Sequence, residues 1–188
     1  MREQIHPMPL SVKGRIMVAL IASGLLSIWI LAIYAYVILP QEIPAHFGFN
    51  GEPTRYGDKL EFLVLPAAFS IAPISFLLLT KYRFTLINKH PYLINLPAFF
   101  TYISKIREER RGWWVNKYFE AMLCLGFVLT LSLLIIEFGI FLGTIYGKLP
   151  AWFTPFSLTL PIWLILPFIF YLRKMSSKLK EEAEHVSK

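Results

Sequence analysis

Long apolar runs separated by short polar segments set the pattern of this chain. A helix that crosses a bilayer needs about 20 mostly apolar residues. Four runs meet that length, at residues 16–39, 62–80, 119–145 and 152–172. The first run is too long for a signal-peptide core and has no small-residue cleavage motif before Pro40, so we expect a retained helix. The pattern predicts an all-α integral membrane protein with four transmembrane helices in a single membrane domain, residues 1–188.

The segment between the first two runs, residues 40–61, differs from its surroundings. It is rich in proline, glycine and charged residues, and it contains the turn dipeptide Asn50–Gly51. Glycine permits backbone angles that other residues avoid, and proline restricts its neighbours. We therefore expect an ordered but irregular loop here.

The segment between the second and third runs, residues 81–118, is longer. Pro91 and Pro97 predict a turn, and residues 97–114 then place apolar side chains at helical spacing, with charged ones opposite. A basic amphipathic helix that ends in two tryptophans is typical of the membrane interface. We expect an interfacial helix before the third transmembrane helix; the alternative is an extension of that transmembrane helix into the aqueous phase.

Composition agrees with lipid as the solvent. Of the 188 residues, 56% are hydrophobic, and the mean hydropathy is +0.54, whereas soluble domains are about 45–50% apolar. The net charge is +7, and of the 19 Lys and Arg residues only Arg55, Lys59 and Lys148 fall on the side of the 40–61 loop. Cationic loops stay in the cytoplasm, so we expect both termini to be cytoplasmic in a cell membrane, the 40–61 loop outside, and the basic segments against anionic lipids rather than nucleic acid.

The sequence LPQEIPAHFGFNGEPTRYGDK in the external loop resembles the signature of a prokaryotic membrane protein family of unknown function, numbered 1648. That signature reads L-P-x-x-I-P-x-H-F-x-x-x-G-x-P-x-x-x-G-x-K. The matching positions are Leu39, Pro40, Ile43, Pro44, His46, Phe47, Gly51, Pro53, Gly57 and Lys59. The family places it directly after the first span, as here. The same domain occurs in proteins similar to the sporulation-delaying-toxin immunity family, so the resemblance implies an immunity or signalling role.

His46 is the first candidate for a functional residue. Glu42, Glu52 and Asp58 are close in sequence, so one interpretation is a metal site that uses His46. The spacing matches no standard set of metal ligands, and a structural hydrogen bond is the alternative. The sequence carries no phosphate-binding loop, nucleophile elbow, H-E-x-x-H motif or cofactor fingerprint, so we expect neither a cofactor nor an enzyme.

Glu137 is the second candidate, because it lies inside the third apolar run. A carboxylate at that depth is costly and normally faces a partner or a cavity. Glu137 either lines an outward-opening polar pocket beneath the external loop, or it is protonated and forms a hydrogen bond that holds two neighbouring helices together. Gly139 and Gly143 form a G-x-x-x-G motif nearby, which permits close helix approach within the chain or in a homo-oligomer.

The leading hypothesis is a non-enzymatic membrane protein that binds or senses a peptide or small ligand. The candidate ligand-binding residues are His46, Asn50, Arg55, Lys59 and Glu137. One alternative is a small oligomeric transporter or channel that uses Glu137. A third class is an intramembrane enzyme or an accessory subunit of one.

Overall fold

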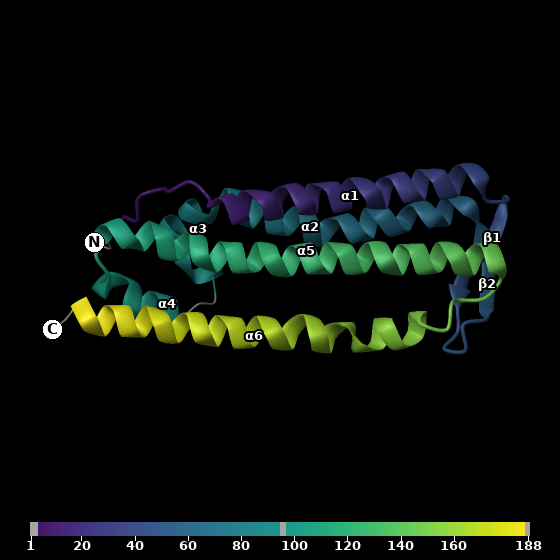
Figure 1. Cartoon of the computed structure of the whole chain (residues 1–188). Coiled ribbons are helices and arrows are strands. Elements are labelled where there is room, and N and C mark those ends of the chain that lie inside the picture. The colour runs from purple at the N-terminus through teal and green to yellow at the C-terminus, as the bar shows by residue number, and fades with distance from the viewer. Residues whose placement is uncertain (1–3, 95–96, 187–188) are drawn as a thin grey trace.

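The computed structural model describes residues 4–94 and 97–186. Long helices dominate it, and a two-stranded hairpin closes one end (Figure 1). The long helices are α1 (Val12–Ile38), α2 (Val64–Lys81), α5 (Glu108–Tyr146) and α6 (Phe153–Val186). The short elements are β1 (Glu42–Phe47), β2 (Pro53–Asp58), η1 (Lys59–Leu63), α3 (Arg83–Lys89), η2 (Pro91–Leu93), α4 (Pro97–Tyr102) and η3 (Ile103–Lys105).

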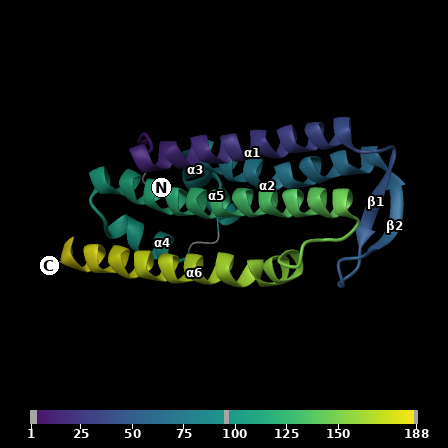
Figure 2. The same ribbon diagram turned by 45° about the vertical axis from the view of Figure 1, so that its right-hand side comes forward.

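Four helical segments in the described part of the chain are long and apolar enough to cross a membrane, and they cover the four predicted spans to within one residue at each end. Both termini lie at one end of the bundle and the hairpin lies at the other (Figures 1 and 2). We call these ends the termini side and the hairpin side. The protein is therefore a multi-pass membrane protein whose hairpin and chain ends are on opposite sides.

Helices α1, α2 and α5 form a three-helix core. Gly14 and Gly24 of α1 let α5 approach closely, because a Cβ at these positions would lie 2.9 Å from Glu120 and 2.8 Å from Thr130. Gly126 of α5 accommodates the ring of Phe76 from α2 in the same way. Without a hydrophobic driving force between helices in lipid, such close packing is what holds spans together.

Helix α6 lies on the side of α5 that is opposite α1, as both views show (Figures 1 and 2). It packs against α5 and, near its C-terminal end, against α4 and η3. In its most apolar stretch of 18 residues only 6% are buried. The membrane part of α6 therefore has most of its surface available to lipid.

The segment predicted to be an irregular loop is instead a β-hairpin. Glu42 pairs with Asp58 at its base, and the register shifts around His46 mark a bulge. The glycine motif on α5 serves packing inside the chain. A Cβ at Gly139 would meet Trp152 and Phe153, and one at Gly143 would meet Leu149.

On the termini side, α5 and α6 are too long to lie wholly within the hydrocarbon of a bilayer. The 39 residues of α5 span about 58 Å, compared with about 30 Å of hydrocarbon. The protruding parts of α5 and α6 form a separate core with α3, α4 and η3, in which Phe99 and Leu179 are fully buried. This corrects the prediction of one interfacial helix over 97–114. The chain breaks near Arg107, its first part docks onto α6, and its second part extends α5, as the alternative held.

Candidate functional site

The hairpin is mounted on the ends of the three-helix core through one inward side chain. Ile43 of β1 is 2% exposed and belongs to a cluster with Ala35, Phe62 and Phe141. Phe62 and Phe141 meet edge to face, with ring centroids 6.4 Å apart. The base of the hairpin is therefore part of the protein core rather than a free loop.

The tip of the hairpin is fixed to the loop that joins α5 to α6. Leu149 N donates to Gly51 O at 2.8 Å, and Lys148 Nζ lies 3.3 Å from Glu52 Oε1. Gly51 has a positive φ of 79°, and a Cβ there would sit 3.3 Å from the Leu149 side chain. Both its backbone angle and its close contact therefore favour glycine.

The two cations of the hairpin segment are already engaged. Arg55 donates to both carboxylate oxygens of Glu61, at 3.0 and 2.6 Å. These hydrogen bonds raise the pKa of the Arg55 guanidinium above its ordinary value. The Lys59 ammonium lies 4.8 Å from the centre of the Tyr36 ring, a cation–π contact that ties the end of the hairpin to α1.

His46 and Asn50 shape the hairpin. His46 Nδ1 lies 2.5 Å from Thr54 Oγ1 across the two strands, which is the hydrogen-bonding role considered from sequence. Asn50 Oδ1 accepts from the backbone N–H of Glu52 at 3.1 Å, which closes the turn. Within residues 4–94 and 97–186, no three His, Cys, Asp or Glu side chains are grouped as a metal would require.

Glu137 lies apart from these four residues. Its side chain is fully buried, and neither carboxyl oxygen has a hydrogen-bond partner among the described residues. It shares a helical face with Thr130 and Phe141, which pack against α1, so it points into the three-helix core. The structure therefore groups His46, Asn50 and Arg55 on the hairpin and Lys59 directly after it, while Glu137 is enclosed within the membrane part.

The second strand of the hairpin is exposed. Thr54, Arg55 and Tyr56 are consecutive exposed residues of β2, and Tyr56 is 57% exposed. At the tip, Phe49 is 88% exposed. The sheet has two strands in the described part of the chain, so each strand also has an outer edge.

A buried polar network on the termini side was not predicted from the sequence. The Arg83 guanidinium donates to Asn116 Oδ1 at 2.7 Å, Thr80 O at 2.8 Å and Met8 O at 2.7 Å. Asn116 Nδ2 also donates to Pro9 O at 2.7 Å. The network ties the segment before α1 to α2 and α5. Its members are far apart in sequence, and the only local hint is an arginine three residues after the end of the second apolar run.

Comparison with known proteins identifies the family. Residues 24–69 match the family model described as a domain of unknown function, DUF1648. An uncharacterized protein of Archaeoglobus fulgidus is 43% identical over 181 residues, which cover 95% of this chain and 97% of that protein. No solved structure matches the chain. The matched region contains the hairpin-side part of α1, the whole hairpin and the start of α2, and the chain belongs to the family of proteins with the DUF1648 domain.

Proposed function

We propose that this protein is a non-enzymatic membrane protein that binds an extended peptide on its hairpin, in an immunity or sensing role. The observation that carries the proposal is the rigid mounting of a two-stranded sheet whose second strand is exposed. Ile43 fixes the base of the hairpin in the core, and the Gly51–Leu149 hydrogen bond fixes its tip.

An exposed strand edge is a natural template for a peptide. Backbone hydrogen bonds along the edge supply affinity, and alternate side chains supply specificity. Tyr56 and Phe49 add exposed aromatic surface beside that edge, and aromatic residues are frequent anchors in binding interfaces. Because the hairpin is already ordered, little conformational entropy is lost when a peptide binds.

The residues of the family signature serve to build and fix the hairpin, and the exposed residues that would contact a ligand lie outside the signature positions. Leu39 and Ile43 are buried, Gly51 adopts a positive φ, and Lys59 contacts Tyr36. These positions build the platform, whereas Phe49 and Tyr56 lie outside the signature positions and are exposed. Family members with the same platform would then select different ligands through the positions that the signature leaves variable.

The direct test is a challenge with secreted peptides. A deletion strain is complemented with the wild-type gene or with a Phe49→Ala/Tyr56→Ala double variant, and is exposed to secreted peptide fractions of neighbouring strains. We expect the wild-type gene to restore survival or a transcriptional response, and the double variant to restore at most about a tenth of it, because two aromatic anchors are worth roughly 1.4 kcal/mol or more.

A matched control removes two apolar side chains elsewhere. Ile71→Ala/Ile74→Ala changes exposed residues of the membrane part of α2 and should behave like the wild type. Unchanged sensitivity of the deletion strain across all fractions, with no transcriptional response, would contradict the proposal.

A second candidate function is transport, and Glu137 is the observation that favours it. A fully buried carboxyl group without a hydrogen-bond partner in the described structure is unusual, and intramembrane carboxyl groups often mark ion or proton pathways. Purified protein in liposomes should then move protons or a small cation, and Glu137→Gln should abolish the flux. No flux from the wild-type protein would contradict this candidate and leave the peptide proposal untouched.

A further inference from the structure

A groove of about 370 Å³ lies between α5 and α6, beside the first turn of α1. Its walls in the middle are apolar and include Leu125, Val128 and Phe168. Cys124, the one cysteine of the chain, is exposed on the same wall. Because the membrane part of α6 is hardly covered by other helices, the groove is accessible from the surrounding lipid.

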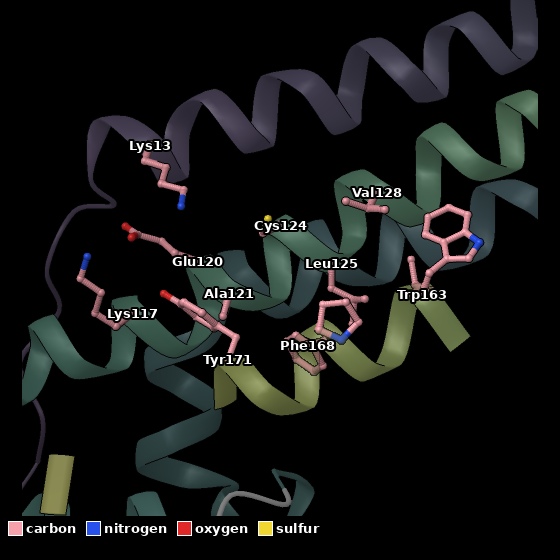
Figure 3. Close-up of a pocket in the computed structure, with 12 residues that line it drawn as sticks. Lys13, Lys117, Glu120, Ala121, Cys124, Leu125, Val128, Trp163, Phe168 and Tyr171 are labelled. Atoms are coloured by element: carbon pink, nitrogen blue, oxygen red, sulfur yellow. The ribbon is translucent and has the colours of Figure 1, made fainter. Parts of the chain in front are cut away.

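The two ends of the groove differ in chemistry (Figure 3). Lys13, Lys117, Glu120 and the Tyr171 hydroxyl gather at one end, and Trp163 lies at the other. The order from polar to apolar along the groove is that of a lipid, with a head group followed by a chain.

The charged end is not neutralised by the protein. Glu120 Oε1 accepts a hydrogen bond from Ser11 N at 2.9 Å, and Glu120 as a residue is 6% exposed. Neither Lys13 nor Lys117 forms an ion pair with another described residue, although the Lys117 ammonium lies 5.0 Å from the centre of the Trp113 ring. Two lysines against one engaged carboxylate leave positive charge at the mouth of the groove.

The depth of these groups also matches a lipid. A span of about 20 residues counted back from the end of α5 at Tyr146 reaches roughly Gly126. Lys117 and Glu120 then lie just outside the hydrocarbon on the termini side, at the level of the phosphates. Val128 lies inside the hydrocarbon, at the level of the acyl or isoprenoid chains.

We propose that the α5–α6 groove binds an anionic membrane lipid from the termini-side leaflet. Its phosphate lies between Lys13 and Lys117, and one hydrocarbon chain lies along Leu125, Val128 and Phe168. The site is independent of the hairpin, which is at the opposite end of the molecule. The apolar wall favours a lipid over free phosphate, because free phosphate has no hydrocarbon chain that could contact this wall.

The test compares lipid retention by the full-length protein in detergent. Native mass spectrometry measures the number of phosphatidylglycerol or phosphatidylcholine molecules that remain bound at equal lipid concentration. We expect the wild-type protein to retain phosphatidylglycerol preferentially. Lys13→Gln/Lys117→Gln should weaken that binding by at least fivefold, since each lysine near a membrane surface contributes about that factor.

Cys124 gives a second readout that reports on this groove specifically. Phosphatidylglycerol should slow alkylation of Cys124 by N-ethylmaleimide in the wild-type protein, while phosphatidylcholine and inorganic phosphate at the same concentration should not. The matched control Lys174→Gln/Lys178→Gln removes two exposed lysines of α6 outside the groove and should keep both the retention and the protection.

Three outcomes would overturn the proposal. The first is equal retention of the two lipids by the wild-type protein, and the second is equal loss in the groove variant and the control. The third is protection of Cys124 by a second copy of the chain at high protein concentration without lipid. If the glutamine variant does not fold, Val128→Trp fills the apolar part instead and should lower phosphatidylglycerol retention; unchanged retention would again contradict the site.

Discussion

At the scale of single residues, two glycines with positive φ allow the effect of backbone conformation to be distinguished from the effect of packing. Gly51 has φ 79° at the hairpin tip and Gly147 has φ 71° at the end of α5. A Cβ at Gly51 would press against Leu149, whereas one at Gly147 would meet nothing within 4 Å. The two glycines adopt the same left-handed backbone conformation without strain, but they differ in what surrounds them.

Gly51→Ala should therefore destabilise the protein more than Gly147→Ala. Each substitution introduces roughly 1–2 kcal/mol of left-handed strain, and Gly51→Ala adds the displacement of Leu149. Thermal unfolding in detergent measures the stability. Hydrogen exchange at the Leu149 amide, which donates to Gly51 O, should accelerate only in Gly51→Ala. Equal effects of the two variants on that amide would show that the hairpin tip is not docked.

At the scale of elements, the termini-side core decides how the segment before α5 behaves. Phe99 of α4 is fully buried and meets the Tyr118 ring of α5 edge to face, with centroids 5.1 Å apart. Arg110 of α5 is joined to Glu182 of α6 by hydrogen bonds of 3.1 and 3.0 Å. The first contact holds α4 against protein rather than against head groups, and the second joins α5 to α6, the helix on which α4 also packs.

Phe99→Ala should consequently lower the free energy of unfolding by about 3–5 kcal/mol, as expected for a large side chain removed from a core. Tyr92→Ala, which removes a side chain that is 78% exposed, should change it by less than about 0.5 kcal/mol. Chemical unfolding of both variants in the same detergent provides the comparison. If the Phe99→Ala protein were as stable as the Tyr92→Ala protein, the result would contradict the buried position of Phe99 and favour the interfacial helix expected from the sequence.

The hairpin shows where sequence reasoning reached its limit at this scale. Pro44 and Pro53 argue against strands, because proline cannot donate to a sheet ladder. They are tolerated here because the sheet has two strands among the residues that the structure describes, so each is an edge strand, and because the register shifts beside Pro44. The order of the segment was predictable from its glycines and prolines, but its strand pairing depends on contacts with α5 and Leu149 that no local pattern contains.

At the scale of the whole molecule, hydropathy predicted the four spans because lipid allows few alternatives to a helix. It placed the ends of the long helices less well. α5 begins at Glu108 and α6 continues to Val186, beyond the apolar runs at 119–145 and 152–172, since these extensions are helical in water through packing rather than hydrophobicity. The α5–α6 groove was not predictable, because Lys13 and Lys117 are separated by more than half of the chain and meet only after folding.

Sidedness is the property on which the peptide proposal depends. The hairpin and the termini lie on opposite sides of the bundle, and most Lys and Arg residues lie on the termini side, which the positive-inside rule assigns to the cytoplasm. With Cys124 replaced by serine, single cysteines at Thr54 and Ser104 probe the two sides, since both positions are exposed. A thiol reagent that cannot cross the membrane should label Thr54→Cys in intact cells and Ser104→Cys only after permeabilisation. The reverse pattern would put the hairpin in the cytoplasm, where no secreted peptide could reach it, while the lipid groove would merely change leaflet.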